Sequence, residues 1–305
     1  MRVPLSAAAV SALALSGCAS DPGPSSEGSA PVVLTTFTVL ADMAEVIGGE
    51  RIEVRSITPA GAEVHDYDPT PTDIRSAAEA DLVLENGLGL EDWLQQFIQH
   101  ADAPAVTVTE GIQTQPVTRL PGHPDDSGSR RESPVNPHAW ISPAQGEAYI
   151  DNIEAALSEH FPDDAEHFAK NADEYRQQLR ELDQQTQARF EAADSQLHLV
   201  TCEGAFSYLT EEYGLGEHYL WPLNAENEGT AAQTEAQIDY VNSHTVPVVF
   251  CESTVNDSAQ QQVAAETGAE MGAPLYVDSL SEGGEVPSYL DLLEYNIDQI
   301  LAAHE

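Results

Sequence analysis

Basic residues are scarce in this 305-residue chain. Eleven lysines and arginines face 52 aspartates and glutamates, which leaves a formal net charge of −41. Lys170 is the single lysine, and neither lysine nor arginine occurs after Arg189. A chain without a basic patch does not neutralise phosphates, so nucleic-acid binding is excluded. The excess of carboxylates instead indicates a solvated acidic surface of the halophilic kind, which keeps a protein soluble at high salt, where charge repulsion is screened.

Long hydrophobic runs are also lacking. The run 5–15 follows Arg2, has the length of a signal-peptide core and is too short to cross a bilayer. It ends in Leu15-Ser-Gly-Cys18, which resembles the lipobox of bacterial lipoproteins, with Cys18 as the acylated first residue. An ordinary signal peptide that happens to contain a cysteine is the alternative. We interpret residues 1–18 as a lipoprotein signal peptide and 19–31 as a flexible polar tether. The rest of the chain is expected to work outside the membrane.

From residue 32 onward, strand-like and helical segments alternate, which predicts an α/β fold with parallel sheets and crossover helices. The predicted strands cover residues 32–36, 52–56, 81–84, 105–108, 197–202, 218–221, 246–251 and 274–277. The predicted helices cover residues 39–47, 72–78, 90–99, 143–157, 205–213, 230–243, 259–271 and 287–302.

One further helix is predicted over residues 163–193. Its apolar side chains recur at spacings of three and four, and no proline or glycine interrupts it. At the standard rise it is roughly 45 Å long, so it acts as a rigid connector. We therefore predict two lobes, each a parallel sheet flanked by helices, at 32–160 and 195–305, joined by one long helix within 161–194. A ligand is expected in the cleft between the lobes.

Side chains that bind metals follow several of these strands. They are His65, behind a Pro/Gly turn, His138 in an Asn-Pro-His-Ala-Trp segment, Glu203 and Asp278. The carboxyl ends of parallel strands are where open α/β sheets hold ligands. A lone histidine in such a loop is weak evidence, but the repetition of the arrangement strengthens it.

Several longer motifs carry a resemblance to a known family. They lie at 35–42, 61–71, 82–91, 136–140, 203–206, 224–230, 250–253 and 289–296. Over 32–300 the chain resembles the metal-binding lipoproteins of bacterial ABC importers, the solute receptors for manganese and zinc. The resemblance implies a metal held by His65 and His138 from the first lobe and by Glu203 and Asp278 from the second. It further implies a monomeric receptor, lipid-anchored outside the cytoplasm, that delivers the ion to an ABC permease.

The chemistry of those four side chains supports a divalent ion. Two neutral imidazoles and two carboxylates balance its charge, and carboxylates that bind through one or both oxygens supply five or six donor atoms. Manganese accepts such oxygen-rich coordination, whereas zinc sites have more His or Cys and four ligands. Zinc receptors of the family typically carry a third histidine where Glu203 stands, and often a His-rich loop, which here holds only His123. Manganese is the first choice, with zinc or ferrous iron as alternatives.

Two other functional classes are weighed against a receptor. A mononuclear hydrolase needs an open metal position and a base, for which Glu63 is the only candidate. A surface adhesin would leave the four candidate ligands unexplained.

Glu252, which also follows a strand, is expected to have a structural role near the site. His198 is expected to be packed or hydrogen-bonded. Surface positions are expected for the remaining histidines, His100, His160, His167, His218, His244 and His304.

The three cysteines lead to a last prediction. If Cys18 carries a lipid, Cys202 and Cys251 are the remaining thiols, in an oxidising compartment. Each ends a predicted strand of the second lobe. The first and third strands of a doubly wound lobe are neighbours, about 4.8 Å apart. That spacing lies within the Cα separation of roughly 4.4–6.8 Å that a disulfide needs. We predict a disulfide, with two buried free thiols as the alternative.

Overall fold

A computed structural model of the chain describes residues 30–94, 103–117, 134–193, 196–223 and 229–304. Cys18, the signal peptide, most of the tether, His100 and His123 lie outside these residues, as does the second half of the helix expected at 90–99. Within the described ranges, no helix combines the length and the apolar character needed to cross a membrane.

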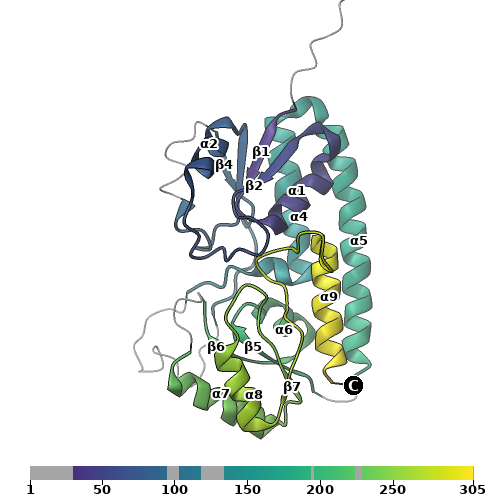
Figure 1. Cartoon of the computed structure of the whole chain (residues 1–305). Helices are drawn as coiled ribbons and strands as arrows, with labels where there is room; N and C mark the ends of the chain where they lie inside the picture. The colour runs from purple at the N-terminus through teal and green to yellow at the C-terminus, as the bar shows by residue number, and fades with distance from the viewer. Residues whose placement is uncertain (1–29, 95–102, 118–133, 194–195, 224–228, 305) are drawn as a thin grey trace, which may run out of the picture.

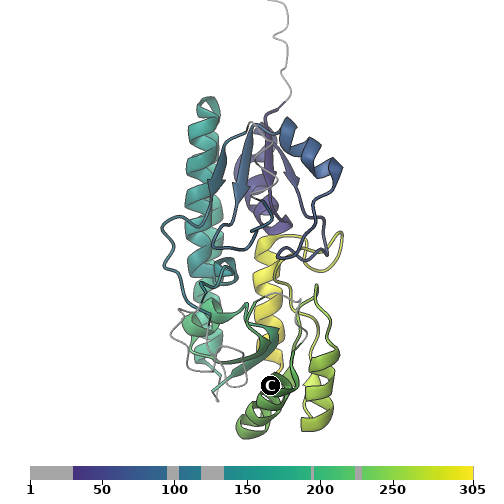
Figure 2. The same ribbon diagram turned by 90° about the vertical axis from the view of Figure 1, so that its left-hand side faces the viewer.

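The first lobe is built on a parallel sheet with the strand order β2-β1-β3-β4. Its strands are β1 (Val32–Thr35), β2 (Glu53–Ser56), β3 (Leu82–Glu85) and β4 (Ala105–Thr107). Alternate side chains of the central strands point to opposite faces. Val33 and Leu84 face α1 (Thr38–Gly48), whereas Leu34 and Val83 pack with Ala77 of α2 (Pro71–Glu79). The sheet is therefore covered by helices on both faces (Figures 1 and 2).

Two long helices run beside the lobes. They are α4 (Pro143–His160) and α5 (Ala165–Glu191), with a 3-10 turn, η4 (Pro162–Asp164), between them. The 27 residues of α5 confirm the predicted long helix. Figures 1 and 2 show that α5 extends along both lobes and that α9 (Tyr289–Ala302) lies against its second half.

The second lobe is also parallel, but its hydrogen-bond ladder is divided into two pairs, β5-β6 and β7-β8. Its strands are β5 (His198–Glu203), β6 (Gly216–Trp221), β7 (Val248–Val249) and β8 (Glu270–Met271). Its helices are α6 (Ser207–Tyr213), α7 (Ala231–His244) and α8 (Ser258–Thr267). The Phe250 N–H donates to the Val200 carbonyl at 2.8 Å and so joins the end of β7 to β5. The first and third strands of this lobe are neighbours, as expected.

Three elements of this lobe are shorter than predicted, and the strand expected over 246–251 is reduced to the two residues of β7. The helix expected over 259–271 ends at Thr267, because Gly268 adopts a left-handed conformation with φ +81° and the chain then enters β8. The strand expected over 274–277 is reduced to a bridge between Glu252 and Leu275. Pro274, which has no N–H to donate, precedes that bridge.

One hydrophobic core passes through both lobes. A single cluster of buried side chains includes residues of β1, α1, α4, α5, α6 and α9. Hydrogen bonds reinforce it: the Tyr289 hydroxyl donates to the Trp140 carbonyl at 2.7 Å, and the Tyr289 N–H to Asp42 at 2.8 Å. The Trp140 indole donates to the Val277 carbonyl at 3.1 Å. This shared core joins the lobes, and each lobe adds a smaller cluster on the other face of its sheet, around Val83 in the first lobe and around Val200 in the second.

Basic side chains pair mostly within the first lobe and along α5. Among the described lysine and arginine ion pairs, only Arg189–Asp298, at 2.6 Å, reaches a helix of the second lobe. We therefore expect sodium chloride to raise the melting temperature of the metal-free protein by several degrees between low and molar concentration, because screening weakens repulsion among carboxylates. A chelator must be present, since bound metal also stabilises. A flat or falling melting temperature would contradict this expectation.

Stability should also rise as the pH falls from about 8 to 6.5. Burial raises the pKa of Glu91 from 4.5 to about 7, although Thr36, Asn86 and Gly87 donate hydrogen bonds to its carboxyl group. Burial likewise raises the pKa of Glu212 to about 7. The folded state therefore binds protons that the unfolded state releases, so stability is lost as the pH rises through this window. Thermal melts test this, and Glu91→Gln should flatten the profile. An equally steep profile in that variant would exclude Glu91 as a cause.

Candidate metal centre

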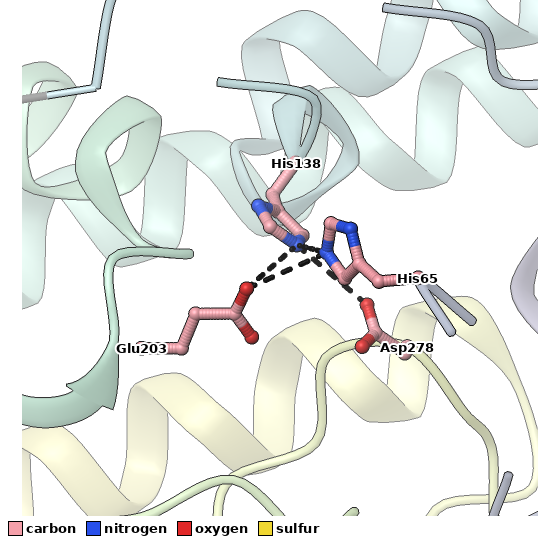
Figure 3. Close-up of side chains that lie close together, drawn as sticks. All are labelled: His65, His138, Glu203 and Asp278. Carbon is pink, nitrogen blue, oxygen red and sulfur yellow. Dashed lines mark hydrogen bonds and ion pairs between the residues drawn. The ribbon is translucent and has the colours of Figure 1, made fainter. Parts of the chain in front are cut away.

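The four side chains singled out in the sequence meet between the lobes (Figure 3). His65 lies in the loop between β2 and α2, and His138 lies just before the 3-10 helix η3 (Ala139–Ile141). Glu203 is the last residue of β5, and Asp278 follows the short bridge at Leu275. His138, Glu203 and Asp278 are buried, and the side chain of His65 is only 4% exposed.

The ligand atoms of this group have the spacing of a coordination shell. The Nε2 atoms of His65 and His138 are 3.1 Å apart, and His65 Nε2 lies 3.4 Å from Glu203 Oε1. His138 Nε2 lies 3.9 Å from the same oxygen and 3.7 Å from Asp278 Oδ1. Atoms bound to one ion at about 2.1 Å are roughly 3.0–3.4 Å apart. A small contraction would therefore place all four side chains on one ion.

Asp278 supplies an independent sign that the site binds a cation. Its Oδ1 atom is buried and has no hydrogen-bond partner in the described structure. Burial raises the pKa of Asp278 well above its ordinary value, and the nearby charges of Glu63 and Glu203 raise it further. A buried carboxylate oxygen without a hydrogen-bond partner is costly, and a metal ion bound to it would remove that cost. The donor set therefore fits a divalent transition metal.

The two imidazoles are suited to donate lone pairs. Burial lowers the pKa of His138 well below its ordinary value, and the neighbouring His65 lowers it further. Burial also lowers the pKa of His65. Both rings are therefore neutral at pH 7 and need not lose a proton to bind a metal.

Asn136 orients His138 and links the two lobes. Its Oδ1 accepts hydrogen bonds from the His138 N–H at 3.1 Å and from His138 Nδ1 at 2.9 Å. Its amide nitrogen donates to the carbonyl of Gly204, the residue after Glu203, at 2.8 Å. Because Nδ1 carries the proton, Nε2 presents its lone pair to the site. Sequence reasoning missed this role, although the Asn two residues before the His was visible.

Asn136→Ala should therefore weaken metal binding by about 10–100-fold, the usual effect of losing a group that orients a ligand. Calorimetric titration with manganese measures it. Asn152→Ala is the matched control, because the Asn152 side chain also donates to backbone carbonyls, in its case those of Val108 and Glu110, which are not part of the metal site. Equal manganese affinities for the two variants would show that Asn136 does not orient His138 for metal binding.

Two further carboxylates brace the ligands. Glu252 is buried, and both its oxygens accept a hydrogen bond from the Glu203 N–H, at 3.3 and 3.2 Å. Glu63 accepts from the His65 N–H at 3.2 Å and from the Thr254 hydroxyl at 3.4 Å. Glu63 thereby connects the His65 loop to the second lobe.

Each of the two cysteines immediately precedes one residue of the Glu203–Glu252 contact in the sequence. Cys202 and Cys251 form a disulfide with a Cα–Cα distance of 4.9 Å. Because their sulfur atoms are bonded to each other, they are not ligands. The disulfide fastens together the ends of β5 and the β7 segment, which carry Glu203 and Glu252.

One histidine was placed wrongly by the sequence reasoning. His218 was expected at the surface, but it is 3% exposed and its Nδ1 lies 2.9 Å from the Gln237 side-chain oxygen. It sits on β6, whose residues from His218 to Trp221 are all buried, so both faces of this part of the strand are covered.

With this geometry established, comparison with known proteins assigns the family. Residues 33–303 match the family described as the periplasmic component A of the zinc-uptake complex. The chain belongs to this family.

Individual relatives of this chain are named for different metals. The chain is 44% identical to the iron-binding protein YfeA of Yersinia pestis over 275 residues. This alignment covers 88% of this chain and 84% of YfeA. It is 34% identical over 297 residues to the manganese-binding lipoprotein MntA of Halalkalibacterium halodurans, covering 96% and 95%. The manganese-bound periplasmic metal binding protein of Candidatus Liberibacter asiaticus has a TM-score of 0.81 at 34% identity, covering 90% of this chain and 100% of that one.

These relatives decide between the functional classes. The family and its relatives are substrate-binding proteins of ABC importers. The chain is thus a metal-binding receptor rather than an enzyme, and the hydrolase alternative is wrong.

Proposed function

We propose that this protein captures a divalent transition metal, manganese in first place, outside the cytoplasm and delivers it to the permease of an ABC importer. The observation that carries the proposal is the convergence of His65, His138, Glu203 and Asp278 in a buried site between the lobes. Two neutral imidazoles and two carboxylates balance a divalent charge, so the ion is bound without leaving net charge in a poorly solvated place. Binding and release are the whole activity.

The donor atoms favour manganese. Glu203 and Asp278 offer up to four oxygens beside two imidazole nitrogens, and such oxygen-rich sites suit manganese better than four-coordinate zinc. The relative named for manganese binding supports this choice. The iron-binding relative and the zinc-uptake family make ferrous iron and zinc the alternatives.

The proposal includes the organisation of the chain. A lipid on Cys18 would anchor a monomer through the tether 19–31. The lobes at 32–160 and 195–305, joined within 161–194, would bind the ion between them and present it to the permease. Relatives named as lipoproteins support the anchor.

Metal analysis tests the proposal. Protein purified without added metal is analysed for its metal content, and the metal-free form is then titrated with manganese, ferrous iron and zinc at equal pH. We expect one manganese ion per chain and loss of that ion in His65→Ala. Zinc binding without measurable manganese binding would overturn the choice of manganese. An absence of binding for all three ions would overturn the receptor itself.

A further inference from the structure

Three histidines from distant parts of the sequence meet at the end of the second lobe. His198 is the first residue of β5, His244 is the last residue of α7, and His304 lies just after α9. All three line one cavity of about 410 Å³, together with residues that include Thr245 and Pro247. Ala303 and His304, which follow α9, line this cavity, and Figure 1 shows the end of α9 at the end of the second lobe away from the first lobe. It is thus separate from the interlobe site.

Hydrogen bonds prepare these imidazoles to act as ligands. Nδ1 of His244 donates to the Tyr240 carbonyl at 3.0 Å, and Nδ1 of His304 donates to the Ile300 carbonyl at 2.9 Å. With the proton held on Nδ1, each ring presents the Nε2 lone pair. His198 Nδ1 lies 2.7 Å from the Tyr240 hydroxyl, so donation to that oxygen leaves its Nε2 free in the same way.

The His198 and His244 rings are close to each other, and the His304 ring approaches the backbone of His198. The ring centroids of His198 and His244 are 4.5 Å apart. His304 Nε2 accepts only a long hydrogen bond, 3.4 Å, from the His198 N–H. A bond of that length is weak, so a stronger partner displaces it at little cost.

The surrounding charge favours a cation. His244 and His304 stand at the C-terminal ends of α7 and α9, where the helix dipole is negative. No lysine or arginine occurs in the chain after Arg189, so no fixed positive charge from this lobe competes. Burial lowers the pKa of His198, and His244 and His304 lower it further, which keeps this ring neutral at pH 7.

We propose that His198, His244 and His304 form a second metal site, which binds an imidazole-preferring divalent ion such as zinc. Three histidines leave a fourth position for water, as in known three-histidine zinc sites. The trio is looser than the interlobe group, because its ligand atoms do not all lie within 4.8 Å of one another in the described structure. Zinc therefore draws the exposed His244 side chain inward, and it binds here more weakly than between the lobes. The bound ion ties the end of α9 to β5 and α7.

Zinc titration of the full chain tests the site, with stoichiometry read by calorimetry. The wild-type protein should bind two zinc ions, the second more weakly. His304→Ala and His244→Ala should each lose the second ion and keep the first, and the retained first ion shows that the variant is folded. Cobalt titration adds a spectroscopic reading, because a second absorption change should be present in the wild-type protein and absent in the variants.

His160→Ala is the matched control. His160 also ends a helix and also donates from Nδ1 to the carbonyl four residues before it, that of Ala156, at 2.8 Å. It does not line the cavity that the three histidines share. This variant should keep both ions. A single zinc ion in the wild-type protein, or a second ion that survives in His304→Ala and His244→Ala, would overturn the proposal.

Discussion

Asp278→Ala is expected to weaken manganese binding by more than about a hundredfold, beyond the usual effect of removing a group that only orients a ligand. The substitution removes up to two donor oxygens and leaves the buried ion with an uncompensated positive charge. The metal-free fold should remain intact, because Asp278 Oδ1 makes no hydrogen bond within the described structure. Burial and the nearby charges of Glu63 and Glu203 make an ionised carboxylate unfavourable at this position in the metal-free protein. Its removal therefore also favours the metal-free fold.

Calorimetric titration measures the affinity, and circular dichroism measures the fold. Glu282→Ala is the control, because it removes one negative charge from an exposed position of the same lobe. If that control weakened binding as much as Asp278→Ala, the effect would be long-range charge and not coordination. An unchanged affinity in Asp278→Ala would remove Asp278 from the site.

Loss of the disulfide should have the second large effect. The bond joins residues separated by 49 positions, and opening a loop of that size is expected to cost about 4 kcal/mol of unfolding free energy. Denaturant unfolding of the double variant Cys202→Ala, Cys251→Ala measures this loss. Both cysteines are buried, so the loss of packing adds to it.

The same double variant should bind manganese more weakly. Cys202 precedes the candidate ligand Glu203, and Cys251 precedes Glu252, which accepts the Glu203 N–H. Reduction of the wild-type protein should reproduce the effect, whereas the reductant should not change the affinity of the double variant. Two free thiols in the unreduced protein, read by mass spectrometry, would end this account.

The elements and residues that the sequence predicted are those with local signals. The long helix follows from apolar side chains at helical spacing, and α5 has that extent. His65 follows β2 and Glu203 ends β5, as the carboxyl ends of parallel strands predict, whereas His138 and Asp278 follow only isolated bridges at Val135 and Leu275. The end of α8 also had a local signal, Gly268, which the prediction overlooked.

Contacts between distant segments left no such signal. His198, His244 and His304 come from three elements, and no spacing rule relates them. Asn136 reaches Gly204 across the lobes, a contact set by how the lobes pack and not by either motif. The burial of His218 likewise depends on β6 being covered on both faces, which the packing of the lobe decides.

The core that passes through both lobes has a thermodynamic consequence. Domains with separate cores unfold in separate steps, whereas elements that share one core lose their packing together. Heat should therefore unfold the whole receptor in one cooperative transition, with a calorimetric enthalpy equal to the van't Hoff enthalpy. Metal bound between the lobes would shift that single transition as a unit, so that a probe placed in either lobe reports the same midpoint.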